Sequence, residues 1–192
     1  GEAADLSGAR LGKLQHLRLH NDGYGTNLHD ESFGSLLGSG ACERLERLTI
    51  SPGRRGVELL RQASIPRLHR LLLSLDDDVG EVDLRGVSWA EHLEHLEVFC
   101  EGLLAPEGGL PQLRSLSFHG DADAIPLSLI PKLRSLQCGW NEPASREQLE
   151  RLLSRARHLR SLSVSTEGPD VVGDILSLVD GSKLRQLSIS FC

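Results

Sequence analysis

Several features are missing from this sequence of 192 residues, and each absence excludes a class of protein. No run of 18 or more apolar residues occurs, so we expect no membrane-spanning helix. Residues 1–5 lack the basic and then apolar pattern of a secretory signal peptide. Acidic residues outnumber basic ones, 27 to 21, and the net charge is -6. This charge argues against nucleic acid as a partner, although it is compatible with a local basic patch.

Motifs that carry catalysis or bind metal ions are also missing. The sequence contains no H-E-x-x-H, no G-x-S-x-G and no complete G-x-x-x-x-G-K-[ST]. His16 and His20 lie four residues apart, which on one strand is roughly 13 Å, too far to share a zinc ion held by bonds of about 2 Å. The acidic run at 76–78 lacks the spacing of a calcium-binding loop. We therefore predict no catalytic residues, no metal site and no cofactor.

One short pattern, Leu-x-x-Leu-x-apolar, occurs eight times along the chain. The first leucines of successive copies are separated by 31, 23, 25, 20, 20, 26 and 25 residues. Because side chains alternate along a strand, the second and third apolar positions of each copy should point into a core, while the residues beside and between them face outward. Each copy returns to the same starting point, so we expect parallel strands. The copies begin at Leu14, Leu45, Leu68, Leu93, Leu113, Leu133, Leu159 and Leu184.

This pattern resembles that of leucine-rich repeats over nearly the whole chain. The resemblance implies an α/β solenoid shaped as a curved horseshoe, with a parallel eight-stranded sheet on its concave side. Short helices, 3₁₀ segments and extended segments would form the convex side. Residues 1–192 should be one domain, and we expect it to be part of a longer protein because its last strand would otherwise lack a polar cap.

The segments between the copies differ in length and in predicted structure. Ser145 and Gln148 form a capping-box pattern before apolar residues at helical spacing, which predicts a helix near 146–156. A second helix is predicted from Asp170 and is ended by Gly181. Shorter helices are predicted near 33–37 and 57–60. The two 20-residue spacings leave less chain, so extended or 3₁₀ segments are expected near 103–106 and 125–127.

The four cysteines are predicted to be thiols. Cys100, Cys138 and Cys192 fall in the fourth, sixth and eighth copies. Strands lie about 4.8 Å apart, so these residues are separated by roughly 10 Å or more, whereas a disulfide requires Cα atoms within about 7 Å. Cys42 is no better placed. Free thiols indicate a reducing compartment, and we expect the protein to be cytoplasmic.

The residues expected on the concave face have two chemistries. Those of the last four strands are mostly serine, whereas those of the first four are mostly cationic, titratable or apolar. Arginine and aromatic residues dominate the binding energy of many interfaces, which favours a surface for an acidic partner. The alternative is that a solvated sheet face needs polar residues and these supply them. The candidate binding residues are His16, Arg18, His20, Arg47, Arg70, Leu72, His95, Glu97, Phe99 and His119.

Two functions are consistent with these observations. Leucine-rich repeats mostly present their sheet to another protein, so the resemblance implies a non-catalytic protein–protein interaction module. The partner would be another protein or other domains of the same polypeptide. Alternatively, the chain is the ligand-sensing or substrate-recognition domain of a larger immune-type sensor, or of a bacterial effector or ligase, whose active domain lies outside it.

Overall fold

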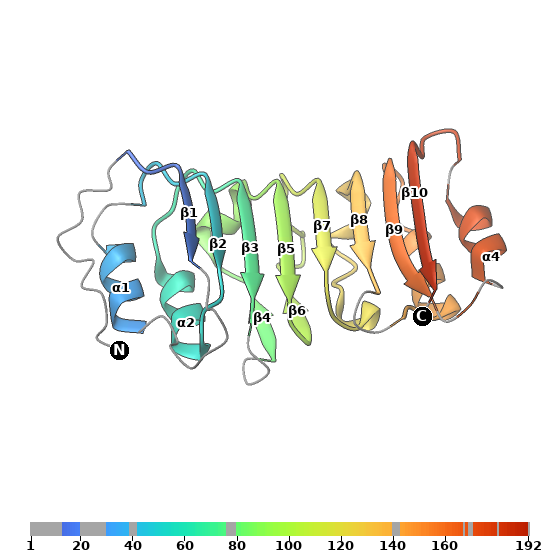
Figure 1. Cartoon of the computed structure of the whole chain (residues 1–192). Helices are drawn as coiled ribbons and strands as arrows, with labels where there is room; N and C mark the ends of the chain where they lie inside the picture. The colour runs from blue at the N-terminus through green and yellow to red at the C-terminus, as the bar shows by residue number, and fades with distance from the viewer. Residues whose placement is uncertain are drawn as a thin grey trace.

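A parallel eight-stranded sheet dominates the structure. The computed structural model describes residues 13–19, 30–38, 42–75, 80–139, 143–166, 168, 171–179 and 181–191. The strands lie in chain order, and every neighbouring pair is parallel (Figure 1). The chain is therefore an α/β protein, as predicted. The strands are β1 (His16–Leu19), β2 (Arg47–Ile50), β3 (Arg70–Ser74), β5 (His95–Phe99), β7 (Ser115–Phe118), β8 (Ser135–Cys138), β9 (Ser161–Thr166) and β10 (Gln186–Phe191).

The repeated leucines place one face of this sheet in the core. The second leucine of each copy pairs in register with its counterpart on the next strand, so these leucines form a continuous row. On the six inner strands each of them is 2% exposed or less. The equivalent residues of β1 and β10, Leu17 and Leu187, are half-buried because each end strand has a neighbour on one side only. This confirms the predicted inward positions.

Helices cover the face of the sheet to which the leucines point (Figure 1). The α-helices are α1 (Asp30–Gly38), α2 (Arg54–Gln62), α3 (Arg146–Leu153) and α4 (Val171–Leu178). The capping box of α3 is formed as predicted: the Ser145 hydroxyl accepts from the Gln148 N–H, and the Gln148 side chain accepts from the Ser145 N–H. The pattern of apolar residues thus identified all four helical segments.

The two shortest connections contain no α-helix, in agreement with the sequence. They contain strand β6 (Gly102–Leu104) and the 3₁₀ segments η2 (Ala122–Ala124) and η3 (Ile130–Lys132). Strand β6 pairs with β4 (Glu81–Asp83) in a second, two-stranded parallel sheet. Ahead of β5, the 3₁₀ segment η1 (Ser88–His92) buries Trp89, whose indole N–H donates to the Leu60 carbonyl oxygen at 2.9 Å. Trp89 therefore joins neighbouring connections behind the sheet.

The predicted curved horseshoe is not seen, because the eight-stranded sheet is neither closed nor curled (Figure 1). A sheet curls when the elements behind it are wider than a strand, since an α-helix needs about 10 Å and a strand about 4.8 Å. Behind β3 and β5, the paired strands β4 and β6 have the same spacing as the sheet itself. The elements in this part of the chain therefore do not force the central strands of the sheet into a strong curve.

The cysteines agree with the prediction where they are described. Cys42, Cys100 and Cys138 are unpaired thiols. Burial raises the pKa of the Cys138 thiol to about 12, and burial is also the main cause that raises the pKa of Cys100 to about 12. Cys192 and the acidic run at 76–78 lie outside the described residues. No helix within the described ranges is long and apolar enough to cross a membrane.

Candidate functional site

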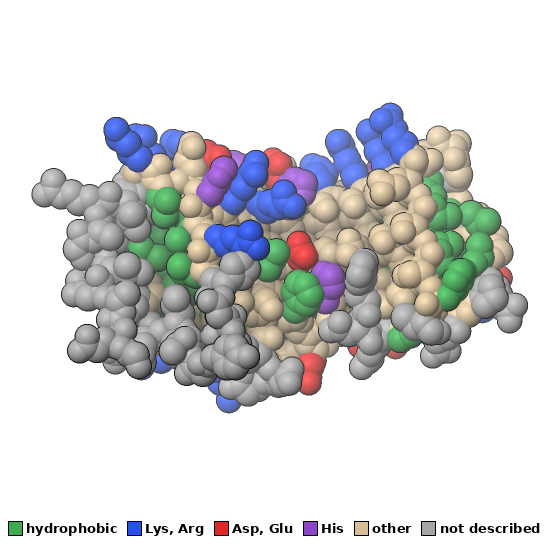
Figure 2. Space-filling view, viewed as in Figure 1, with side chains coloured by type: hydrophobic (Ala, Val, Ile, Leu, Met, Phe, Trp, Pro, Cys, Tyr) green, Lys and Arg blue, Asp and Glu red, His purple; other side chains and the backbone are tan. Residues whose placement is uncertain are grey.

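The first candidate surface is the open face, defined as the side of the eight-stranded sheet opposite the helices (Figures 1 and 2). Strand register brings four of the predicted binding residues into one column there: His16 pairs with Arg47, Arg47 with Arg70, and Arg70 with His95. All four are exposed. Neighbours in the column are separated by about 4.8 Å, the spacing of strands. The predicted column is therefore present.

The column places two arginines between two histidines. Partial burial lowers the pKa of His95, and the positive charge of nearby Arg70 lowers it further. Arg47 acts in the same direction, whereas Glu94 opposes it. Arg47 and Arg70 each contribute a guanidinium cation to the column. Neither forms an ion pair with another described residue. The column thus presents two adjacent positive charges without a counter-ion from the described part of the chain.

A second column on the open face mixes apolar and charged side chains. Arg18 pairs with Thr49, Thr49 with Leu72, and Leu72 with Glu97. Arg18 is exposed, and Leu72 and Glu97 are half-buried. Leu72, one of the predicted binding residues, therefore lies two residues from Arg70 on the same strand and directly beside an acidic side chain. His20 lies outside the described residues.

His119, another predicted binding residue, is largely covered by its neighbours. The imidazole stacks on the ring of Phe99, with ring centroids 3.8 Å apart and an interplanar angle of 3°. Its Nε2 lies 3.1 Å from the Ser117 hydroxyl and 3.5 Å from the Glu97 carboxylate. These contacts leave His119 only 7% exposed. Burial lowers the pKa of His119, and the nearby Glu97 carboxylate partly opposes that effect.

Phe99 and His119 lie at the centre of the open face, where its character changes. Figure 2 shows cationic and histidine side chains over β1 to β5 and mostly uncharged polar surface over β7 to β9. The paired residues there are small, as in Ser115 with Ser135 and Ser135 with Ser161. The open face therefore has a charged half and a flat, serine-rich half that meet at the Phe99–His119 stack.

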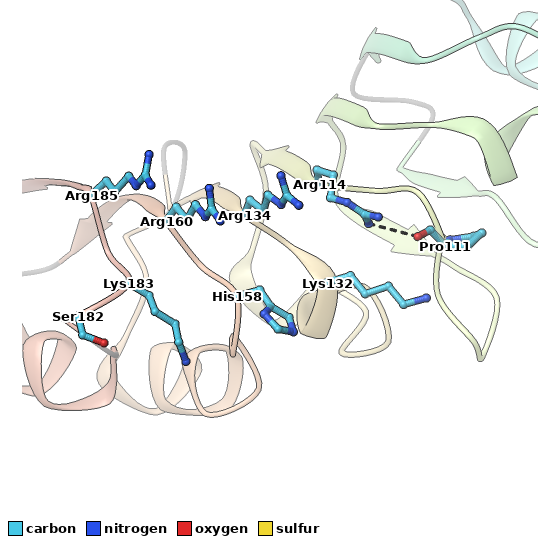
Figure 3. A pocket seen from close by; sticks show the side chains of 9 residues that line it. All are labelled: Pro111, Arg114, Lys132, Arg134, His158, Arg160, Ser182, Lys183 and Arg185. Carbon is cyan, nitrogen blue, oxygen red and sulfur yellow. Dashed lines mark hydrogen bonds between the residues drawn. The ribbon is translucent and has the colours of Figure 1, made fainter.

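The second candidate surface was missed by the sequence reading. We call it the basic groove: a depression of about 660 Å³ at the edge of the sheet where β7 to β10 begin. Figure 3 shows four arginines in one row and three further basic or titratable side chains in a second row. None of the described lining residues is acidic. The groove is lined by Pro111, Arg114, Lys132, Arg134, His158, Arg160, Ser182, Lys183 and Arg185.

Backbone hydrogen bonds fix the row of arginines. The Arg134 N–H donates to the Arg114 carbonyl at 2.7 Å, the Arg160 N–H to the Arg134 carbonyl at 2.8 Å, and the Arg185 N–H to the Arg160 carbonyl at 2.7 Å. Each arginine immediately precedes its strand, so the four follow the strand spacing of about 4.8 Å. The row is therefore a consequence of the same repeat that builds the sheet.

A simple signal in the sequence encodes both rows. The first leucine is buried in the six inner copies and half-buried at Leu14 and Leu184, so the residues on either side of it point outward. In the last three copies these residues are Lys132 and Arg134, His158 and Arg160, and Lys183 and Arg185. In the first four copies the second position is Gln15, Glu46, His69 and Glu94, although the first position is also basic there at Lys13, Arg44 and Arg67. Arginine at the second position is therefore confined to the last four copies, at one end of an acidic chain.

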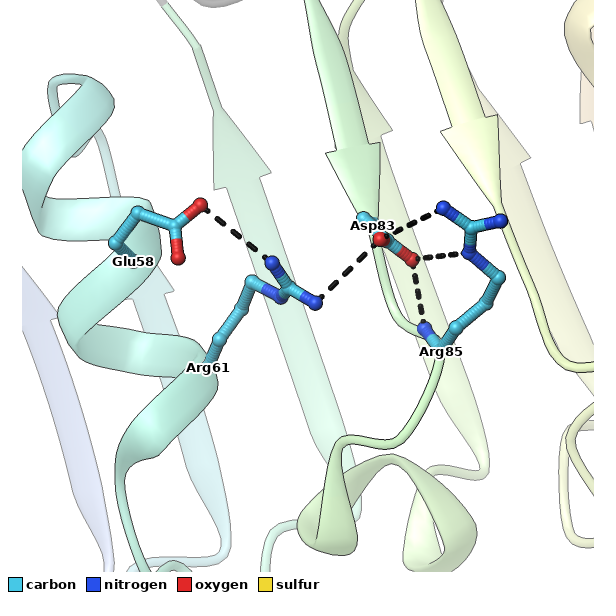
Figure 4. A network of polar contacts seen from close by, with 4 residues as sticks. All are labelled: Glu58, Arg61, Asp83 and Arg85. Carbon is cyan, nitrogen blue, oxygen red and sulfur yellow. Dashed lines mark hydrogen bonds and ion pairs between the residues drawn. The ribbon is translucent and has the colours of Figure 1, made fainter.

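A third charged cluster, on the helical side, is used within the protein itself. Arg85 contacts the Asp83 carboxylate at 2.9 Å, and Arg61 of α2 contacts it at 3.4 Å (Figure 4). Arg61 also reaches Glu58, 3.5 Å away. The hydrogen bond from Arg85 is the main cause that lowers the pKa of Asp83. This network joins α2 to β4 and has a structural role.

The described residues contain no group of three or more histidine, cysteine, aspartate or glutamate side chains that could hold a metal ion. No protein-family model matches the chain, and no curated protein is similar to it in sequence. The two surfaces therefore have to be interpreted from their own chemistry.

Proposed function

We propose that the chain is a leucine-rich-repeat solenoid that binds another protein, without catalysis, through the open face of its sheet. The eight in-register strands in chain order support the repeat assignment, as does the row of buried leucines at equivalent positions. The connections behind the strands vary from α-helix to 3₁₀ and extended segments, which such repeats tolerate.

One observation carries the proposed binding role: the open face bears two adjacent arginines, without an ion pair to any described residue, on the same face as an aromatic stack. Arg47 and Arg70 occupy neighbouring strands and form no ion pair with a described residue. Like charges at this separation repel each other, and an acidic partner would replace repulsion with attraction. Arginine and aromatic side chains contribute most to many interfaces. Leu72 lies near Arg70 on β3, and Phe99 lies on the same face, paired with Ser74 four residues further along that strand.

The partner is either a separate protein or other domains of the same polypeptide. In the second case the chain would be the recognition domain of an immune-type sensor or of a bacterial effector or ligase. We also propose that the protein functions in the cytoplasm. Its three unpaired cysteines support this location, because free thiols persist in reducing compartments.

Charge reversal on the open face tests the proposal. The native protein and the double variant Arg47→Glu/Arg70→Glu are used to capture proteins from a lysate of the cells that make the chain, and bound proteins are quantified by mass spectrometry. A matched control is Arg54→Glu/Arg55→Glu, which makes the same charge change at two exposed positions of α2 on the helical side.

We expect a partner that the native protein and the helical-side control bind equally and that the open-face variant loses. Thermal unfolding of all three proteins must show that each is folded. Equal capture by all three would refute binding through this column. Loss in the α2 control alone would place binding on the helical side.

A further inference from the structure

The basic groove is separate from the open face, and three of its four arginines form no ion pair within the described part of the chain. Arg134, Arg160 and Arg185 are exposed and form no ion pair with any described residue. Arg114 is held by the carbonyl oxygens of Pro111 and Leu113, at 3.2 and 3.1 Å. Four guanidinium groups thus gather at one edge of a chain with net charge -6.

We propose that the basic groove binds an extended acidic segment of a polypeptide, whose carboxylates pair with the two rows of cations. This binding is separate from the proposed role of the open face.

The dimensions of the groove fit such a segment. Four arginines at strand spacing cover about 14 Å, which an extended peptide spans with four or five residues at about 3.3 Å each. Successive side chains of an extended peptide point to opposite sides. One set of carboxylates would therefore meet the arginine row, and the other set would meet the row that contains Lys132 and His158 (Figure 3).

The lining of the groove favours an acidic polypeptide over nucleic acid or a membrane surface. A guanidinium presents parallel N–H donors that match a carboxylate in a bidentate pair. Single-stranded nucleic acid binds where aromatic side chains stack on its bases, and no described lining residue of the groove is aromatic. Membrane surfaces are bound by segments that insert apolar side chains, and Pro111 is the one apolar residue among the described lining residues.

A direct binding assay tests the proposal with defined probes. A fluorescein-labelled hexaglutamate peptide is titrated with native protein and followed by fluorescence anisotropy, with hexaglutamine as the uncharged probe. The groove variant is Arg134→Glu/Arg160→Glu, and Arg134→Gln/Arg160→Gln removes the charges without reversing them. The open-face variant Arg47→Glu/Arg70→Glu is the control, because it carries the same charge change at a different site.

We expect the native protein and the open-face variant to bind hexaglutamate alike, hexaglutamine to bind neither, and the charge-reversal groove variant to bind hexaglutamate at least about 10-fold more weakly. The glutamine variant should lie between. Raising the salt concentration from about 50 mM to about 500 mM should weaken native binding strongly, because exposed charges are screened.

Three results would overturn the proposal: no binding of hexaglutamate by native protein, equal binding by the groove variants, or loss in the open-face variant alone. Oligothymidylate and phosphatidylserine vesicles are tested in the same way. Tighter binding of either probe, lost in the groove variants, would assign the groove to nucleic acid or to a membrane surface instead. The proposed function of the open face stands or falls separately, since its variant is the control here.

Discussion

Two glycines with almost the same backbone conformation should respond very differently to alanine. Gly86 has a φ of 71° and Gly109 a φ of 69°, both in the left-handed region that favours glycine. A Cβ added at Gly86 meets nothing within 4 Å. A Cβ added at Gly109 would lie 2.3 Å from the carbonyl oxygen of Ser128, whereas real contacts of this kind essentially never fall under 3.0 Å. Comparing the two alanine variants therefore separates the cost of backbone strain from the cost of moving two closely packed turns apart.

The expected cost differs accordingly. Gly86→Ala should lower the free energy of unfolding by about 1–2 kcal/mol, the cost of a left-handed conformation for a residue with a Cβ. Gly109→Ala carries the same cost and also forces its turn away from Ser128. That movement strains the hydrogen bond from the Ser128 hydroxyl to the Pro106 carbonyl, 3.1 Å in length. Displacement of packed groups adds about 1–3 kcal/mol, so we expect a total of about 2–5 kcal/mol.

Urea denaturation of the native protein and both alanine variants measures these costs, provided that the slope with denaturant is the same for all three. Similar losses for Gly86→Ala and Gly109→Ala would refute the reasoning, because they would mean that the two turns do not approach as closely as the structure shows. A larger loss at Gly86 would contradict it more strongly.

Three further predictions concern single side chains. Ser145→Ala removes the hydroxyl that caps α3 and should lower the free energy of unfolding by about 1 kcal/mol in urea; no change would contradict the capping role. Burial, and after it the charge of Arg70, lowers the pKa of His95 below its ordinary value of 6.5. His95 therefore contributes to the stability of the fold above pH 6.5, and this contribution is lost as the pH falls through the lowered pKa. In thermal unfolding across pH, His95→Gln should reduce the acid-side loss of stability, and an unchanged profile would count against this. In a Cys192→Ser background, the thiol of Cys138 should resist iodoacetamide at about pH 8 until the protein unfolds, and rapid native labelling would contradict its burial.

The sheet could be predicted because its cause is local and repeated. Alternation along a strand sends Leu48 and Ile50 into the core and Arg47 to the other face, and the same register follows in each copy. The α3 helix could be predicted for the same reason, because Ser145 and Gln148 form reciprocal capping hydrogen bonds within one turn. Each feature depends on a few neighbouring residues.

The burial of His119 could not be predicted in this way. Alternation gives the face to which a side chain points, but it does not give what covers that side chain. Strand β7 ends at Phe118, so His119 lies just beyond it, and its cover is the ring of Phe99 from a neighbouring strand. The pairing of β4 with β6, and with it the lack of strong curvature, also depends on contacts between distant segments.

The basic groove was missed for a different reason. Its residues flank the first leucine of each copy and precede the strands, whereas the candidate site was sought on residues within the strands. Lys132 and Arg134, for example, lie on either side of buried Leu133. Once the first leucine is known to be buried, the sequence alone indicates both rows of cations.

The central claim is that the open face, and not the helical side, contacts a partner. Photo-crosslinking tests it most directly: benzoylphenylalanine replaces Leu72 on the open face in one protein and Arg55 of α2 in another, and each is irradiated in a lysate of the cells that make the chain. The account predicts that one protein is crosslinked repeatedly through position 72 and that this crosslink disappears when Arg47→Glu/Arg70→Glu is added. Crosslinking of a specific protein through position 55, with none through position 72, would contradict the account.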